Sequence, residues 1–251
     1  MELGLRGKVY VVTAASAGLG RAVADALVGE GACVVPVARR AAVLDDFRAA
    51  SPDQVAPLVG DVADPDVPRR AAQLAVQRFG RLDGALVSVG GPPRGTVLAA
   101  TDEQWTAAFG SVFLPALRVA RAVVAEGGPG VVLGFVLSTS AKAPLSSMAI
   151  SNGLRPGLAM LVKQLADELG PQGTRTFGLL PGSIDTERLQ ALRAGVDDPE
   201  AAKRAAAAAI PLRRIGEPEE FGRVAAFLLS PAASYVSGCL VPVDGGSLRA
   251  L

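Results

Sequence analysis

A glycine-rich turn near the start of the chain carries the residue types needed to bind a phosphate group. An apolar run at residues 9–12 ends in Thr13-Ala14-Ala15-Ser16-Ala17-Gly18-Leu19-Gly20, where a helical pattern begins. Glycines at such a turn let backbone N–H groups approach an anion, and the dipole of the following helix favours negative charge there. The turn therefore predicts a pyrophosphate site with contacts from Thr13, Ser16, Gly18, Leu19 and Gly20.

The strands and helices around this turn indicate the fold that positions it. Short β-branched runs occupy residues 9–12, 33–37, 55–59, 85–89, 131–137, 176–180 and 240–243, and helical patterns occupy about 18–30, 41–50, 65–80, 102–127, 152–170 and 217–230. Nearly continuous apolar runs are typical of parallel strands buried on both faces. Their alternation with helices predicts one α/β domain over residues 1–251, a Rossmann-like, doubly wound, seven-stranded parallel sheet with helices on both faces. Pro36 conflicts with a central place for the second run, because proline cannot donate to a strand ladder.

The composition excludes several classes of chemistry. The 251 residues contain no histidine and two cysteines, which excludes a Ser-His-Asp triad, a histidine-containing or Cys₄ zinc site and a disulfide framework. A balance of 25 Lys and Arg against 24 Asp and Glu gives no basic surface for nucleic acid. The apolar stretches, such as 131–137, are shorter than the roughly 18–20 residues of a membrane span, and the N-terminus lacks a secretory pattern. We expect a cytoplasmic protein with neither nucleic-acid nor membrane partners.

Further motifs, together with the turn, resemble the classical short-chain dehydrogenase/reductase family. The turn at 13–20 resembles the family's TGxxxGxG loop, with Ala14 in place of the first glycine. The segment 83–90 resembles DxLVNNAG, PGSIDT at 181–186 matches PGxIxT, and the segments 214–220 and 241–246 match the family's C-terminal pattern. The resemblance covers essentially the whole chain and implies a nicotinamide cofactor. It assigns adenine contacts to Asp61 and Val62, and further cofactor contacts to Gly90, Pro181, Gly182, Ile184 and Thr186.

The end of the second predicted strand indicates which nicotinamide cofactor is bound. Sites selective for NAD usually place an acidic residue there, which accepts a hydrogen bond from the ribose 2′-hydroxyl. Here the sequence reads Ala38-Arg39-Arg40, and a guanidinium pairs with a 2′-phosphate that a carboxylate would repel. We therefore expect NADP(H) rather than NAD, with Arg39 as the main contact. The alternative is that these arginines are solvated residues at the start of the next helix.

The resemblance also identifies the family's catalytic positions, which are a serine, a tyrosine, a lysine and an asparagine. Ser138 occupies the serine position, and the tyrosine position, 13 residues later, is Ser151. The lysine position is Arg155 and the asparagine position is Val112. A serine hydroxyl is a much poorer proton donor than a tuned phenol. Arginine stays charged, so it stabilises a developing oxyanion only electrostatically.

Two functions of different classes follow from these residues. The first is an NADP(H)-dependent oxidoreductase, similar to a 3-oxoacyl reductase, that acts on a small-molecule carbonyl or alcohol. In it, Ser138 and Arg155 polarise the carbonyl, and Ser151 or water delivers the proton. The second is a redox-inactive NADP(H)-binding or interaction protein that has lost the catalytic tyrosine, since Tyr10 and Tyr235 lie outside the expected site. A non-redox enzyme on the same scaffold is a third alternative.

Residues 186–210 interrupt the alternation of strands and helices. An insertion after the carboxyl end of a strand lies where ligands bind in open α/β sheets. We interpret it as a substrate lid, and the alternative is a peripheral helical hairpin. In the expected cleft, Arg94 of the segment 90–95 indicates an anionic group on the ligand. The resemblance implies a homotetramer or homodimer formed through the helices at about 102–127 and 152–170 and the C-terminal segment.

Overall fold

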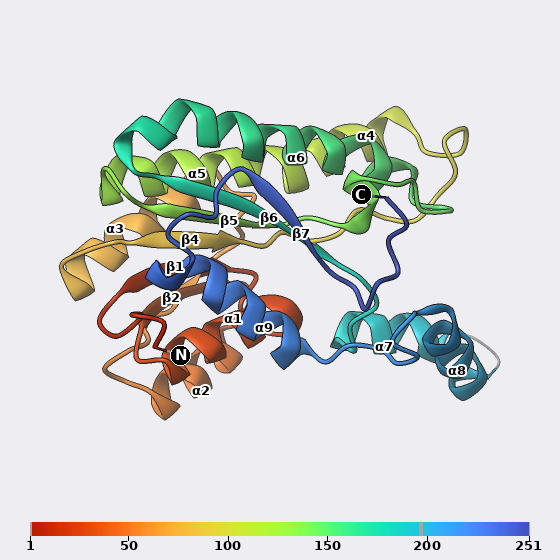
Figure 1. Cartoon of the computed structure of the whole chain (residues 1–251), viewed down its shortest axis with the longest axis horizontal. Coiled ribbons are helices and arrows are strands. Elements are labelled where there is room, and N and C mark those ends of the chain that lie inside the picture. Colours follow the sequence, from red (N-terminus) through yellow and green to blue (C-terminus); the bar gives the residue numbers. More distant parts are fainter. Residues whose placement is uncertain (1, 196–197, 251) are drawn as a thin grey trace.

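Parallel strands alternate with helices along the chain, as Figure 1 shows. The computed structural model describes residues 2–195 and 198–250. The strands of its sheet are β1 (Val9–Thr13), β2 (Cys33–Ala38), β3 (Leu58–Val59), β4 (Gly84–Val87), β5 (Val132–Val136), β6 (Arg175–Pro181) and β7 (Cys239–Val243). Their order, β3-β2-β1-β4-β5-β6-β7, confirms the predicted doubly wound parallel sheet. From β1 the chain adds strands first towards one edge of the sheet and then, from β4 onwards, towards the other edge. The point between β1 and β4 where this order reverses is where such sheets bind ligands.

Helices cover both faces of the sheet (Figure 1). They are α1 (Gly18–Gly29), α2 (Ala41–Ala50), α3 (Val67–Phe79), α4 (Asp102–Ala108), α5 (Leu114–Gly127), α6 (Ala149–Leu169), α7 (Glu187–Ala194), α8 (Pro199–Ala209) and α9 (Pro218–Leu229). Buried side chains of α3, α5 and α6 belong to one hydrophobic cluster, and those of α1, α2 and α9 belong to another. Val9 and Val11 of β1 face the first cluster, whereas Tyr10 and Val12 face the second. This burial on both faces explains the continuous apolar strands.

Pro36 lies in a central strand, at a place where the ladder is interrupted. Val34 donates to the carbonyl oxygen of Gln54 and accepts from the N–H of Ala56. Pro36 faces the same neighbour as Val34, because alternate residues of a parallel strand bond to the same side. On that side β2 pairs through a bridge between Val34 and Val55 and through the two-residue strand β3. The missing N–H of proline therefore falls between these two short pairings.

Two long helices differ in detail from the prediction. The predicted helix at 102–127 contains a π-helical turn, Phe109–Phe113, between α4 and α5. The stretch Asp102–Gly127 is long and apolar enough to cross a membrane, a property shared by core helices of soluble proteins, and α5 packs here against α3 and β4. Helix α6 begins at Ala149 and continues through Pro156. Its opening turns therefore include Arg155 and also Ser151, which lies just before the predicted helix at about 152–170.

The segment 186–210 forms two helices, α7 and α8, beyond the main body of the sheet (Figure 1). Lys203 of α8 pairs with Asp185, at 3.4 Å between Nζ and Oδ2. Residues 196 and 197 of the predicted lid lie outside the described residues. The first residues of α7 reach the cleft described next, and the role of the segment as a lid stays a prediction.

Candidate active site

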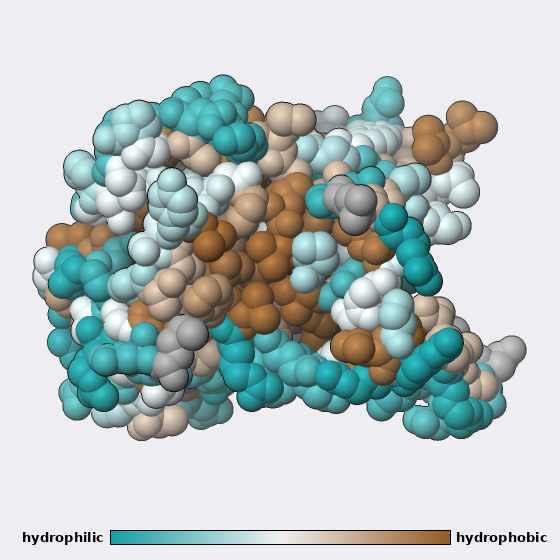
Figure 2. Space-filling view, in the orientation of Figure 1, coloured by the Kyte–Doolittle hydropathy of each residue, from teal (hydrophilic) through white to brown (hydrophobic). Residues whose placement is uncertain are grey.

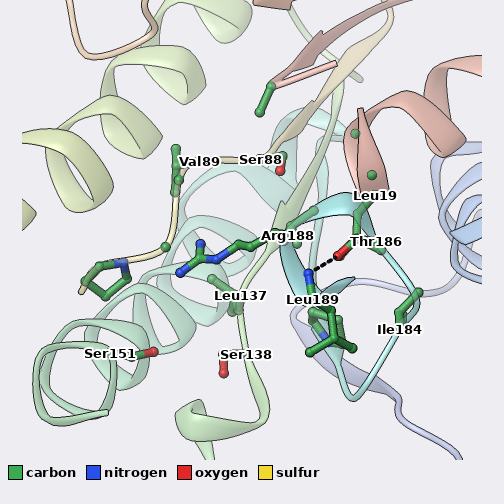
Figure 3. A pocket seen from close by; sticks show the side chains of 18 of the residues that line it. Leu19, Ser88, Val89, Leu137, Ser138, Ser151, Ile184, Thr186, Arg188 and Leu189 are labelled. Carbon is green, nitrogen blue, oxygen red and sulfur yellow. Dashed lines mark hydrogen bonds between the residues drawn. The ribbon is translucent and has the colours of Figure 1, made fainter. Parts of the chain in front are cut away.

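Two adjoining cavities lie at the carboxyl edge of the sheet, on either side of the glycine-rich turn. The larger has a volume of about 490 Å³ and the smaller about 270 Å³. Ala14, Ala17 and Gly90 line both, so the two cavities form one extended cleft at the reversal between β1 and β4. The larger cavity (Figure 3) is lined by the predicted residues Gly18, Leu19, Gly20, Gly90, Ser138, Ser151, Arg155, Pro181, Gly182, Ile184 and Thr186. The smaller cavity is lined by Ser16, Arg39, Asp61, Val62 and Gly90.

The turn between β1 and α1 is folded so that its backbone can meet an anion. Ala14 adopts a left-handed conformation with φ of 52°, and a β-carbon on Gly20 would lie 2.5 Å from the Ala14 carbonyl oxygen. Glycine is therefore required at position 20 for the turn to close on the helix. The N-cap residue of α1, Ala17, has no capping side chain, and the first turn of α1 carries no acidic residue. The N–H groups at this helix end fit a pyrophosphate.

Thr13 is the exception among the predicted contacts. Its Oγ1 donates to the carbonyl oxygen of Ser88 at 2.5 Å and accepts from the Ser88 N–H at 2.8 Å. The side chain is buried and is not among the residues that line either cavity. The hydroxyl is thus engaged within the protein, and the contact of Thr13 with the cofactor stays a prediction. Thr13 joins the ends of β1 and β4, the two strands that flank the cleft.

The two arginines after β2 take different positions. Arg39 lines the smaller cavity, its side chain is 79% exposed, and its Nη1 lies 3.7 Å from Oδ2 of Asp61. Arg40 reaches back over the glycine-rich turn, where Nε donates to Oγ of Ser16 at 3.1 Å and Nη2 to the Ser16 carbonyl oxygen at 2.9 Å. Its Nη1 also lies 3.4 Å from Oε2 of Glu187 on α7. Arg39 therefore stands at the smaller cavity while remaining largely exposed, and Arg40 is held against Ser16, a turn residue that lines this cavity.

The serine and arginine positions meet at the floor of the larger cavity. Ser138 follows β5, and its Oγ accepts from the N–H of Ser140 at 3.1 Å, which leaves its own hydroxyl proton available to a ligand. Ser151 on α6 lies 2.9 Å from Ser140, oxygen to oxygen, in a buried hydrogen bond. Arg155, one helical turn after Ser151, donates from Nη1 to the carbonyl oxygen of Val136 at 3.0 Å. The predicted trio is therefore assembled around one space.

Arg155 carries a charge in an unfavourable position. The residue is 5% exposed, and its Nε is buried without a hydrogen-bond partner among the described residues. Burial, and secondarily the positive charge of Arg188, lower the pKa of Arg155 to about 10. A buried cation without a counter-ion is costly, since charges lose their hydration on burial. The site is thus suited to a ligand that supplies an acceptor or a negative charge at this floor.

The chain's tyrosines do not supply the missing phenol. Tyr10 is 1% exposed in β1, and its hydroxyl donates to the carbonyl oxygen of Leu229. Burial, and to a lesser extent Asp83, raise the pKa of Tyr10 far above its usual range. Tyr235 is fully exposed in the C-terminal segment. At the asparagine position, Val112 is buried in the π-helical turn, a feature that often accompanies functional sites.

Three residues were missed by the sequence prediction: Arg188, which lines the cleft, and Arg40 and Ser140, which contact residues that line it. Arg40 could have been found, because it adjoins Arg39, but the sequence does not show which of the two faces the turn. Ser140 follows Ser138 by two positions, and only the fold of the 3₁₀ turn at 139–141 brings it to Ser151. Arg188 lines the larger cavity from α7. No pattern around Arg188 distinguishes it from the other arginines of the segment.

Comparisons with known proteins agree with this geometry. The sequence profile described as "Enoyl-(Acyl carrier protein) reductase" matches residues 13–247. The chain is 31% identical to a 3-oxoacyl-[acyl-carrier-protein] reductase of Thermotoga maritima, over 96% of this chain and 98% of that one. L-sorbose reductase from Gluconobacter frateurii, crystallised with NADPH and L-sorbose, has a TM-score of 0.93 and 29% identity over the whole of both chains.

A further solved structure resembles this chain closely. It is the apo form of a short chain oxidoreductase from Pseudomonas aeruginosa PAO1 that contains an atypical catalytic center, with a TM-score of 0.91 and 27% identity over 99% of this chain and all of that one. The sheet order, the cleft at its reversal point and the match over residues 13–247 lead to one assignment. The chain is a member of the classical short-chain dehydrogenase/reductase family.

Proposed function

We propose that this protein is an NADP(H)-dependent oxidoreductase, similar to the 3-oxoacyl reductases, that interconverts a small-molecule carbonyl compound and an alcohol in an altered active site. One observation carries the proposal. A single extended cleft has an uncapped helix N-terminus and Arg39 at one end, where Arg40 is held against Ser16, and it has Ser138 and Arg155 at the other end. The relatives named above include an acyl-carrier-protein reductase and a sorbose reductase that was crystallised with NADPH.

The preference for NADP(H) rests on the arginines at the smaller cavity. Arg40 is held over the turn by two hydrogen bonds to Ser16, and Arg39 stands opposite Asp61. A 2′-phosphate between the two guanidinium groups would form charge-assisted, bidentate hydrogen bonds. We propose Arg39 as the main contact, supported by Arg40. Replacing Arg39 or Arg40 by alanine should weaken NADPH binding about tenfold or more while leaving NADH nearly unchanged. Equal losses for the two cofactors would refute the 2′-phosphate role.

The chemistry follows from the floor of the larger cavity. When bound, the reduced nicotinamide supplies a hydride to the carbonyl carbon. Ser138 donates a hydrogen bond to the carbonyl oxygen, and the fixed charge of Arg155 stabilises the negative charge that develops there. Ser151, or water beside it, delivers the proton that completes the alcohol. Because no tuned phenol acts as the acid, we expect turnover roughly 10²–10⁴-fold below that of a family member with a tyrosine.

The hydrogen bond between Ser151 and Ser140 favours a second candidate function. The bond occupies the hydroxyl of Ser151, which stands where relatives have the tyrosine. A buried hydroxyl that is already hydrogen-bonded is expected of a site that keeps its packing but no longer transfers a proton. In that case the protein binds NADP(H) without reducing a substrate and acts through an interaction. Saturable NADPH binding with no loss of absorbance across a panel of ketones, diketones and acyl thioesters would favour this second function.

Two variants separate the candidates. Ser138→Ala should reduce turnover at least tenfold while leaving NADPH affinity unchanged, since Ser138 is proposed to contact the substrate oxygen. Ser151→Tyr places a phenol on the cavity wall one helical turn before Arg155, and it should raise turnover if the site is otherwise competent. If the wild type is inactive and S151Y reduces a carbonyl, the redox-inactive function is supported. If Ser138→Ala has no effect on a measurable wild-type rate, the assignment of Ser138 is wrong.

We also propose that the protein is a homodimer or homotetramer. Apolar side chains gather over the edge strand β7 (Figure 2), whose residues are only partly buried. Met160 of α6 is 70% exposed and Phe109 is 42% exposed. Exposed apolar surface of this kind is typical of subunit contacts. Light scattering of the purified protein tests the proposal, and a monomer at all concentrations contradicts it.

A further inference from the structure

The larger cavity has a strong excess of positive charge. Three arginines line it, Arg94 on the loop after β4, Arg155 on α6 and Arg188 on α7. Glu187 is the one acidic residue among its lining residues, and it already pairs with Arg40 outside this cavity. Among the side chains that the structure describes, Arg94, Arg155 and Arg188 have no carboxylate partner. Three unpaired guanidinium groups around one cavity repel one another unless an anion enters.

Arg188 extends across the cavity. Figure 3 shows its side chain running from α7 towards the strand-end segment that carries Val89, above Ser138 and Ser151. The guanidinium lies against Gly91, where a methyl group would overlap both Nη atoms. Glycine at position 91 therefore leaves the space that the guanidinium occupies. The charge of Arg188 is also close enough to contribute to the lowered pKa of Arg155.

The position of Arg188 relative to the serines indicates which part of a ligand it meets. Ser138 is the proposed contact of the reacting oxygen, and Arg188 faces the same space from the opposite wall. The orphaned Nε of Arg155 is a second, independent sign that this space lacks its acceptor. Guanidinium groups bind carboxylates and phosphates through paired N–H donors. A ligand bearing such a group near its carbonyl would neutralise the cavity.

We propose that Arg188, with Arg94 at the rim, forms a subsite for an anionic group, so that the substrate is a carbonyl compound carrying a carboxylate or phosphate close to the reacting carbon. That the ligand is a substrate rests on the proposed function, whereas the existence of the anion subsite does not. Arg188 is then a residue that determines specificity, and α7 supplies it from the segment interpreted as a lid.

The test uses matched pairs of ligands that differ in charge. Acetoacetate is compared with methyl acetoacetate, and dihydroxyacetone phosphate with dihydroxyacetone, at constant ionic strength. Binding to the full-length protein is measured by calorimetry with and without NADPH, and steady-state rates are measured where turnover occurs. The variants are Arg188→Gln and, as a control, Arg204→Gln, which removes the same charge from exposed α8 outside the cavity.

In at least one pair, we expect the Kd or the KM of the anionic member to be about tenfold lower than that of its neutral partner. R188Q should abolish that preference, whereas R204Q should retain it and leave kcat unchanged. Preference within the first pair identifies a carboxylate and within the second a phosphate. Equal affinity of charged and neutral members overturns the proposal, as does an R188Q variant that loses NADPH affinity alone, since Arg188 would then serve the cofactor. If NADPH fails to bind but the Arg188-dependent preference persists, the subsite stands and the proposed oxidoreductase function falls.

Discussion

Replacing Arg155 by methionine should make the ligand-free protein more stable. The side chain is almost completely buried, its Nε has no partner, and its pKa is lowered to about 10 by burial and by Arg188. The pKa of an arginine in water is considerably higher, so keeping Arg155 charged in the folded protein costs about 3 kcal/mol near neutral pH. Methionine has a similar length and fills irregular apolar space without a charge. Exchanges of buried charges for apolar side chains are often stabilising.

One contact is lost in the exchange. Arg155 donates to the carbonyl oxygen of Val136, and leaving that acceptor unpaired costs about 1–2 kcal/mol. The net prediction is that R155M raises the free energy of unfolding by about 1–2 kcal/mol. For a chain of this length this corresponds to a rise in Tm of roughly 2–8 °C. Urea and thermal denaturation without ligands measure both quantities.

The dependence on pH gives the prediction its sign. A base whose pKa is lowered in the folded state is penalised at every pH below that value, and the penalty disappears as pH rises through it. The advantage of R155M over the wild type should therefore be constant around neutral pH and shrink above pH about 10. Saturating NADPH should stabilise the wild type more than R155M, because the ligand uses the charge that the variant lacks.

Arg175 provides the matched control. It is also a partly buried arginine with a lowered pKa, caused mainly by burial, but its guanidinium donates to carbonyl oxygens of Leu228, Leu229, Ser230 and Val236. R175M should therefore destabilise the protein by about 2 kcal/mol or more, since it strands several acceptors. If R155M proves as destabilising as R175M, the charge of Arg155 is not an unmet cost and the reasoning about the cavity floor is refuted.

Three further predictions concern the turn, the Thr13 hydrogen bonds next to it and the charged cluster at the opposite end of β1. Ala14→Gly should raise the free energy of unfolding by about 0.5–1 kcal/mol, because it relieves a left-handed alanine at some cost in chain entropy, and lower stability would contradict the strain argument. Thr13→Val should lower stability by about 1–2 kcal/mol without changing the residues that line the cleft, and a loss of NADPH affinity with unchanged stability would contradict this structural role. Asp83→Asn should lower stability by about 2 kcal/mol near neutral pH. Burial raises the pKa of Asp83, but hydrogen bonds from Arg81, Val9 and Lys8 lower it further, so the net pKa is lowered. The stability difference between the wild type and D83N should therefore shrink as pH falls below about 4, and a difference that grows would contradict the argument.

The strands and their parallel order could be predicted because burial on both faces leaves a direct mark on the sequence. Val9 to Val12 alternate between two hydrophobic clusters, so every residue of the run is apolar. The glycine-rich turn was equally visible, since Gly20 is required by the close approach of the Ala14 carbonyl. The place of Pro36 in the sheet was harder to predict. A proline is tolerated in a strand only where its missing N–H faces a gap in the ladder, and the sequence does not show which neighbouring strand that side faces.

The residues of the cleft were predicted well where a motif fixed the backbone and poorly where side-chain direction decides. The sequence places Arg39 and Arg40 side by side, and only the conformation of the chain before α2 turns Arg40 to Ser16. Thr13 lies in the motif, yet its hydroxyl is used by Ser88. Arg188 lines the cavity from the first turn of α7, and the placement of that helix depends on long-range packing rather than on local pattern.

The central claim is that the cleft holds NADP(H), and the chain contains a reporter for it. Trp105 is its single tryptophan, and its indole ring packs against Gly153 of α6, which lies between Ser151 and Arg155. The packing is so close that a β-carbon on Gly153 would lie 2.5 Å from Cη2 of the indole. Indole emission overlaps the absorption of reduced nicotinamide, so energy transfer reports binding without turnover. Titration with NADPH should quench Trp105 saturably at one cofactor per chain, with NADH binding about tenfold more weakly. Absence of saturable quenching by either cofactor would contradict the account.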